Sequence, residues 1–196
     1  MKVGVLVSGA GTNLQALLDA DLAPATIAVV ISNKPGVGAL DRAAAAGVSA
    51  EVISHAGVSR EAFEDRLLAA LARHGVELVV LAGFMRVLTP HFVERFPLRI
   101  INTHPSLLPA FPGADAIPQA LAHGVKLTGA TIHFVDTTLD GGPIIAQAPV
   151  TVDVGDDVAS VRAKIQREEH RLLPIVVQRL AAGRLSCQGR IVSGAD

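Results

Sequence analysis

The stretch VGVLVSGAGTNLQALLDA, residues 3–20, runs from a short apolar segment through a glycine-rich loop into a leucine-rich segment. The apolar run at residues 3–7 is rich in valine, which is typical of a buried strand. Residues 8–13 form the glycine-rich loop, and the leucines that follow recur at helical spacing. The stretch therefore predicts a strand, a tight turn and a helix, the first unit of an α/β fold.

The glycine-rich loop has the properties of a phosphate site. The first N–H groups of the expected helix would point at a bound anion beside Gly11, and Thr12 and Asn13 add side-chain donors. The loop lacks the Lys of a P-loop. It also lacks the third glycine of the dinucleotide fingerprint, where Leu14 stands, and an acid after the second expected strand, at residues 32–34. A tight turn with Thr12 or Asn13 as the N-cap fits the loop equally well.

Short apolar runs and helical stretches alternate through the rest of the first half. The expected strands are residues 3–7, 27–31, 51–53, 78–82 and 99–102, and the expected helices are residues 13–20, 40–46, 60–74 and 90–96. Such alternation indicates a parallel sheet with helices on both faces. In the second half, strand-like runs at 130–135 and 144–150 precede an amphipathic helix at 158–182, in which Pro174 predicts a kink or break. We expect an α/β fold with a Rossmann-like, mostly parallel sheet and an antiparallel C-terminal extension.

The composition limits the possible functions. Half of the 196 residues are hydrophobic, enough for a core without disulfides, and the single cysteine, Cys187, matches the reducing cytoplasm. The formal net charge is −1 without a basic cluster, which argues against nucleic-acid binding. The apolar run at the start is too short for a signal peptide or a membrane span. Metal-binding motifs such as HExxH are absent, so we expect no metal.

Three polar residues suggest a transfer reaction. Asn102 and His104 end an expected strand, where ligands bind in open α/β sheets. Asn102 can donate to a developing oxyanion and His104 can move a proton near neutral pH. Asp140, on a Gly-Gly-Pro loop, would favour the imidazolium form of His104. Each residue also fits a structural role, but their coincidence with a phosphate-type loop favours transfer to a phosphorylated small molecule. His133 fits the core as well as the site.

Four motifs carry a family resemblance. They are LVSGAGTNLQ at residues 6–15, VLAGFMR at 80–86, NTHPSLLP at 102–109 and LDGGP at 139–143. In these motifs and their order, the chain resembles the phosphoribosylglycinamide formyltransferases, folate-dependent enzymes of purine synthesis, over nearly its whole length. The resemblance implies that the amine of glycinamide ribonucleotide attacks the formyl carbon of 10-formyltetrahydrofolate.

The resemblance also implies a division of the site. Catalysis would fall to Asn102, His104 and Asp140, and ribonucleotide binding to Gly11, Thr12, Asn13 and Glu169. The folate side would comprise Arg60, Met85, Arg86, Val87, Leu88, Asn102, Asp136, Thr137, Thr138, Leu139 and Asp140. By sequence alone, ordinary core positions are the better interpretation of Met85, Val87 and Leu88. Residues 1–102 would form the phosphate-binding half, and residues 103–196 the folate and catalytic half, of a single domain that is a monomer or a homodimer.

Two positions depart from the family pattern. Asp115 and Ile117 stand where members often carry histidine, which leaves a contribution of this loop to catalysis or substrate contact in question. The departure does not affect the three central residues.

Several alternatives stay open. Methionyl-tRNA formyltransferase and formyltetrahydrofolate deformylase share the Asn–His–Asp set. They normally carry an added RNA-binding or regulatory domain, which we do not expect here, and the loop at 8–13 favours a phosphorylated acceptor. A non-catalytic nucleotide-binding module is a third alternative. A dinucleotide-dependent reductase is disfavoured by Leu14 and the missing acid.

Overall fold

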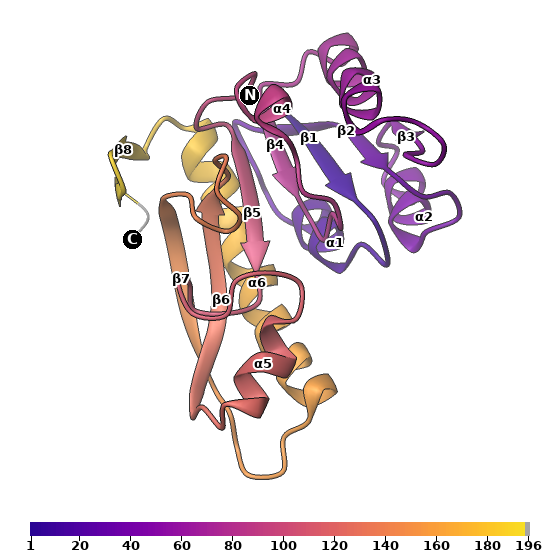
Figure 1. Cartoon of the computed structure of the whole chain (residues 1–196). Helices are drawn as coiled ribbons and strands as arrows, with labels where there is room; N and C mark the ends of the chain where they lie inside the picture. Colours follow the sequence, from indigo (N-terminus) through magenta and orange to yellow (C-terminus); the bar gives the residue numbers. More distant parts are fainter. Residues whose placement is uncertain (195–196) are drawn as a thin grey trace.

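The computed structural model describes residues 1–194, in which one large sheet is covered by helices on both faces (Figure 1). The sheet has seven strands in the order β3-β2-β1-β4-β5-β6-β7. Strands β1 to β5 pair in parallel, whereas β6 and β7 are antiparallel to their neighbours. The expected fold class, a mostly parallel sheet with an antiparallel extension, is confirmed.

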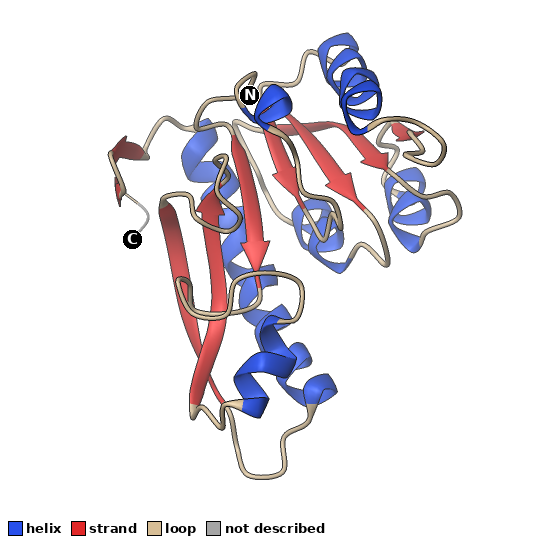
Figure 2. Ribbon diagram, viewed as in Figure 1, coloured by secondary structure: helices blue, strands red, loops and turns tan. Residues whose placement is uncertain are grey.

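The strands and helices alternate along the first half (Figure 2). The strands are β1 Lys2–Val7, β2 Thr26–Ser32, β3 Ala50–Val52, β4 Leu78–Leu81, β5 Ile100–His104, β6 Leu127–Phe134 and β7 Ile144–Thr151. The helices are α1 Thr12–Asp19, α2 Gly38–Ala45, α3 Arg60–Arg73, α4 Pro90–Val93, α5 Ala116–Ala122 and α6 Val158–Ala181. Strands β8 Ser186–Gln188 and β9 Ile191–Ser193 form a separate antiparallel pair.

Two expectations about helices are wrong. Helix α4 ends at Val93 instead of Phe96. The break expected at Pro174 does not occur, since α6 continues from Val158 to Ala181, and the kink given as its alternative stays a prediction. Pro174 removes one backbone hydrogen bond, but buried side chains on both sides of it, such as Leu173 and Val176, hold the helix against the sheet.

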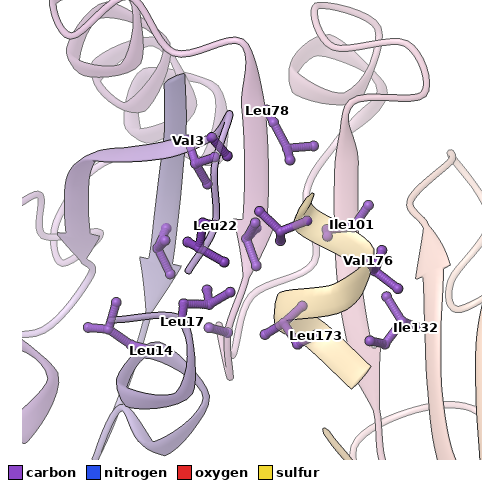
Figure 3. Close-up of a cluster of buried hydrophobic side chains, with 14 of the residues drawn as sticks. Val3, Leu14, Leu17, Leu22, Leu78, Ile101, Ile132, Leu173 and Val176 are labelled. Carbon is purple, nitrogen blue, oxygen red and sulfur yellow. The ribbon is translucent and has the colours of Figure 1, made fainter. Parts of the chain in front are cut away.

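Side-chain alternation along the strands produces two cores. Val3, Val5 and Val7 of β1 face α1, α2 and α6, whereas Leu6 faces α3 and α4. Figure 3 shows Leu173 of α6 in the first of these cores. Because both faces are buried, the central strands are apolar throughout, which is why their sequences read as continuous runs.

The strand order places a crevice beside β1. The strands that follow β1 along the chain, β2 and β3, extend the sheet on one side of it, whereas β4 and the later strands extend it on the other side, so the order of strand addition reverses at β1. Open α/β sheets bind ligands at the carboxyl ends of the strands that flank such a switch point. The loops that follow β1 and β4, residues 8–11 and 82–89, lie there.

Among residues 1–194, no helix combines the length and apolar character needed to cross a membrane.

Candidate active site

The end of β5 presents polar side chains to both faces of the sheet. Asn102 and His104 share the face of Ile100, on the side of α3 and α4. Thr103 shares the face of Ile101, on the side of α1 and α6. One strand end therefore supplies functional groups to two neighbouring spaces.

Antiparallel pairing of β5 with β6 sets His133 opposite Asn102. The two side chains meet with 3.2 Å between Asn102 Nδ2 and His133 Nε2. His133 Nδ1 lies 2.8 Å from the Phe134 carbonyl oxygen, which can only accept, so Nδ1 carries the hydrogen. Nε2 then accepts from the Asn102 amide. Burial lowers the pKa of His133, which keeps the ring neutral and suited to this role.

The structure brings His104 and Asp140 together. Asp140 Oδ2 lies 3.4 Å from His104 Nδ1, and both side chains are almost fully buried. His104 Nε2 donates to the Phe111 carbonyl oxygen at 2.8 Å, so Nδ1 is the ring nitrogen that faces the carboxylate. Asp140 Oδ2 also accepts from the Gly113 N–H at 2.8 Å.

The loop that carries Asp140 is tightly folded onto the end of β6. Asp140 has a φ of 50°, a left-handed conformation that Asp adopts more readily than most residues. A Cβ at Gly142 would collide with the Phe134 carbonyl oxygen, so this position requires glycine. The LDGGP motif therefore has a steric reason as well as a chemical one.

The glycine-rich loop leaves the start of α1 free of a side-chain cap. Gly11 is the N-cap, with a φ of 75°, so the alternative in which Thr12 or Asn13 caps the helix is wrong. Asn13 turns inward, and its Nδ2 donates to Thr103 Oγ1 and to Glu169 Oε2, each at 3.2 Å. The first helical N–H groups thus have no side-chain acceptor in the described structure, which suits an anion.

A cavity of about 240 Å³ lies between this loop and α6. It is lined by Gly11, Thr12, Asn13, Gly83, Met85, Thr103, Ile117, Arg162, Gln166 and Glu169, among others. Asn13 Oδ1 is buried and has no hydrogen-bond partner within the described residues. Burial raises the pKa of Glu169. The cavity therefore offers a ligand both a free acceptor and a carboxyl group that protonates readily.

The sequence analysis missed Arg162 and Gln166. They lie on the same face of α6 as Glu169, at the spacing i, i+4, i+7. This spacing was the signal that could have identified them.

The expected folate-side residues fall on three separate segments. Met85 and Val87 are 68% and 54% exposed, so a core interpretation is wrong for them, whereas Leu88 is buried. The Arg86 guanidinium lies over the Phe63 ring, 5.4 Å from its centroid. The exposed side chains of Met85 and Val87 form a rim beyond the end of β4.

Residues 136–140 form the second segment, the loop between β6 and β7. Asp136 accepts from the Thr138 N–H at 2.8 Å, while Thr137, Thr138 and Leu139 are exposed. Arg60 is the first residue of α3 and is also exposed. Within the described part of the chain, Arg60 makes no hydrogen bond to the three central residues, so its assignment to the site stays a prediction.

The two departures from the family pattern lie at the start of α5. Asp115 is exposed and precedes the helix, and Ile117 is buried against Ile165 and lines the cavity. An apolar side chain at 117 makes this part of the wall unable to titrate. Among residues 1–194, no group of three His, Cys, Asp or Glu side chains is arranged to hold a metal ion.

Comparison with known proteins places these residues in a family. Residues 1–177 match the family model described as formyl transferase. The chain is 43% identical over 189 residues to phosphoribosylglycinamide formyltransferase of Escherichia coli (strain K12), covering 94% of this chain and 89% of that protein. It is 44% identical over 187 residues to the trifunctional purine biosynthetic protein adenosine-3 of Gallus gallus, covering 93% of this chain but only 19% of that longer protein.

A solved structure is similar throughout. The crystal structure of glycinamide ribonucleotide transformylase 1 from Symbiobacterium toebii matches with a TM-score of 0.97 and 48% identity, covering 100% of this chain and 94% of that chain. The shared fold includes the strand ends that carry the site. From the family match and these similarities, the chain belongs to the formyl transferase family.

Proposed function

We propose that this enzyme transfers the formyl group from 10-formyltetrahydrofolate to the amine of phosphoribosylglycinamide, a step of purine biosynthesis. The observation that carries the proposal is a connected set: Asp140 lies 3.4 Å from His104 and 3.8 Å from His133, which contacts Asn102. The N-terminus of α1, which has no side-chain cap, adds an anion site. The first group of residues suits acyl transfer, and the helix N-terminus suits the phosphate of the acceptor.

The acceptor would lie in the cavity between α1 and α6. Its phosphate would bind the N–H groups at Gly11, Thr12 and Asn13, and its ribose hydroxyls could donate to Glu169 or Asn13 Oδ1. Glu169 and Asn13 already share a hydrogen bond, so the acceptor would join an existing network. This arrangement points the acceptor amine toward the end of β5.

The formyl donor would lie on the opposite face of β5. On that side, Leu88 belongs to the core that includes Ile100, and the loop at 136–140 follows β6, the partner of β5, so we place the donor between these two segments. The exposed apolar side chains of Val87 and Leu139 suit a flat heterocyclic ring. Arg60 would contact the more distant, anionic part of the folate. The formyl carbon then stands between the two substrates.

Attack of the neutral amine on the formyl carbon gives a tetrahedral intermediate with a negative oxygen and a positive nitrogen. The second hydrogen of Asn102 Nδ2, which His133 does not use, would donate to that oxygen. His104 would donate through Nδ1, which carries a hydrogen in the imidazolium form, because Nε2 already donates to the Phe111 carbonyl oxygen. A proton leaves the acceptor nitrogen and reaches N10 of the folate, through His104 or through a water held by Asp140. Cleavage of the bond between the carbon and N10 then releases tetrahydrofolate and the formylated amine.

The test is an assay of tetrahydrofolate release with phosphoribosylglycinamide present and absent. Release that requires the acceptor supports the proposal. Release with water alone would identify a deformylase. Binding of the phosphorylated acceptor without any release would identify a non-catalytic binding module.

The same proposal covers the remaining properties. Residues 1–102 would hold the phosphate and residues 103–196 the folate and the catalytic groups, although Asn13 and Glu169 already join the two halves. We propose that the reaction takes place in the cytoplasm, with which a single free cysteine, Cys187, agrees, and we expect no metal. The enzyme would be a monomer or a homodimer, which sedimentation analysis would distinguish.

A further inference from the structure

Ser8 is the first residue of the glycine-rich loop, directly after β1, and its side chain contacts residues outside that loop. Its hydroxyl donates to Asn33 Oδ1 at 2.7 Å and accepts from the Met85 N–H at 2.9 Å. The residue is only 6% exposed. Because the hydroxyl has one hydrogen and uses it on Asn33, its lone pairs are directed at Met85.

Asn33, which follows β2, fixes the direction in which the Ser8 hydroxyl points. It is 2% exposed. Its Nδ2 lies 3.3 Å from His55 Nδ1, in the loop between β3 and α3, which orients the amide so that Oδ1 faces Ser8. The contacts therefore run from the β3–α3 loop through Asn33 and Ser8 to Met85.

The segment 83–88 depends on this contact. Within residues 1–194, the bond from Met85 to Ser8 is the single hydrogen bond that the backbone of residues 83–88 makes. Phe84 and Leu88 anchor the segment in the core of α3 and α4, while Met85 and Val87 between them are exposed. Ser8 thus sets how far the exposed part of the segment stands from the cavity.

The glycine-rich loop has other supports. The Ala39 N–H donates to the Gly9 carbonyl oxygen at 3.2 Å, and Arg42 Nε donates to the Ala10 carbonyl oxygen at 2.9 Å. Loss of the Ser8 hydroxyl therefore removes a support of segment 83–88 without removing those of the phosphate loop.

We propose that Ser8 is a positioning residue that fixes segment 83–88 for the formyl donor, although it belongs to the motif of the phosphate loop. This inference rests on the proposed function. It predicts that Ser8→Ala raises the KM for the formyl donor about 3- to 10-fold, the effect of one lost hydrogen bond. The KM for the ribonucleotide should rise less than the KM for the donor, because Met85 also lines the acceptor cavity while the phosphate loop keeps its own contacts. The kcat should change by less than about twofold, because the catalytic residues keep their contacts.

The matched control is Ser32→Ala. Ser32 ends β2, is fully buried, and uses its hydroxyl on the backbone of Lys34, with Oγ donating to the Lys34 carbonyl oxygen at 2.6 Å. It loses the same atom at the end of the neighbouring strand without touching segment 83–88. Its KM for the formyl donor should stay at the wild-type value.

Hydrogen exchange of the Met85 amide supplies a readout that does not need activity. Protection of this amide should fall in Ser8→Ala and persist in Ser32→Ala. Unchanged protection, or an equal rise of donor KM in both variants, would overturn the role of Ser8. A wild-type enzyme without formyl transfer would instead overturn the proposed function, while the exchange result would still decide the role of Ser8.

Discussion

Replacing Asn102 and His133 separately and together tests whether the histidine acts through the amide. Asn102→Ala removes one oxyanion donor, and we expect kcat to fall roughly 100- to 1,000-fold, equivalent to about 3–4 kcal/mol. His133→Phe keeps the donor but removes the acceptor, 3.2 Å away, that orients it. One such hydrogen bond contributes about 1 kcal/mol, so kcat should fall roughly fivefold.

The coupling energy measured with the double variant decides whether His133 acts through Asn102. If His133 acts only by orienting Asn102, then Asn102→Ala/His133→Phe should be no slower than Asn102→Ala alone, which gives a coupling energy of about 1 kcal/mol. The assay is tetrahydrofolate release at saturating concentrations of both substrates, with thermal melting to confirm that each variant folds. A further fivefold loss in the double variant would refute the reasoning, because His133 would then act independently of the amide.

A second His→Phe substitution, away from the site, controls for the exchange of an imidazole for a phenyl ring. His91 lies on α4, where its exposed side chain pairs with Asp65 at 2.8 Å. His91→Phe makes the same exchange away from the site and should leave kcat unchanged. A loss in this variant similar to that of His133→Phe would show that the assay reports general destabilisation.

Three further predictions concern the two subsites. Gly11→Ala should lower the free energy of unfolding by about 2 kcal/mol or more and raise the KM for the ribonucleotide, because φ is 75° and a Cβ would lie 2.7 Å from Ala39. The control is Gly9→Ala, whose added Cβ would have no atom within 4 Å, measured with the same kinetics and denaturant melts. Glu169→Gln should be more stable than the wild type at pH 8 but not at pH 4. Because the raised pKa makes the folded state bind the proton more tightly, the contribution of Glu169 to stability is present below the ordinary Glu range and is lost as the pH rises through the raised pKa. Thermal melts at the two pH values that show no such difference would contradict this. Asp140→Asn should lower kcat about a hundredfold or more with little change in ribonucleotide binding measured by calorimetry, since Asn tolerates a φ of 50° and can still accept from the Gly113 N–H; equal losses of both would indicate collapse of the loop.

The fold could be predicted largely because its strands are buried on both faces. Continuous apolar runs and glycine punctuation identify such strands locally, without knowledge of their neighbours. The short helix α5, which contains Pro118, and the three-residue strands β8 and β9 carry too little periodic signal. The helix break at Pro174 was wrong because burial along α6 outweighs one missing hydrogen bond.

The site was partly predictable for a different reason. Asn102, His104 and Asp140 lie within motifs that the sequence displays directly. The place of His133 depends on the register of β5 against β6, which no local pattern encodes. The resemblance placed Met85 on the folate side, whereas the sequence alone favoured the core, because an apolar side chain that contacts a ligand has the same composition as one that packs inside.

The three residues at the end of β5, Asn102, Thr103 and His104, point alternately to the two faces of the sheet. Successive side chains on a strand point to opposite faces and lie about 3.3 Å apart along it. Thr103 bonds the Asn13 amide on the side of the cavity, while Asn102 and His104 meet His133 and Asp140 on the other side. In the proposed placement, a phosphorylated amine held on the first side and a formyl donor held on the second would therefore meet at the edge of this one strand.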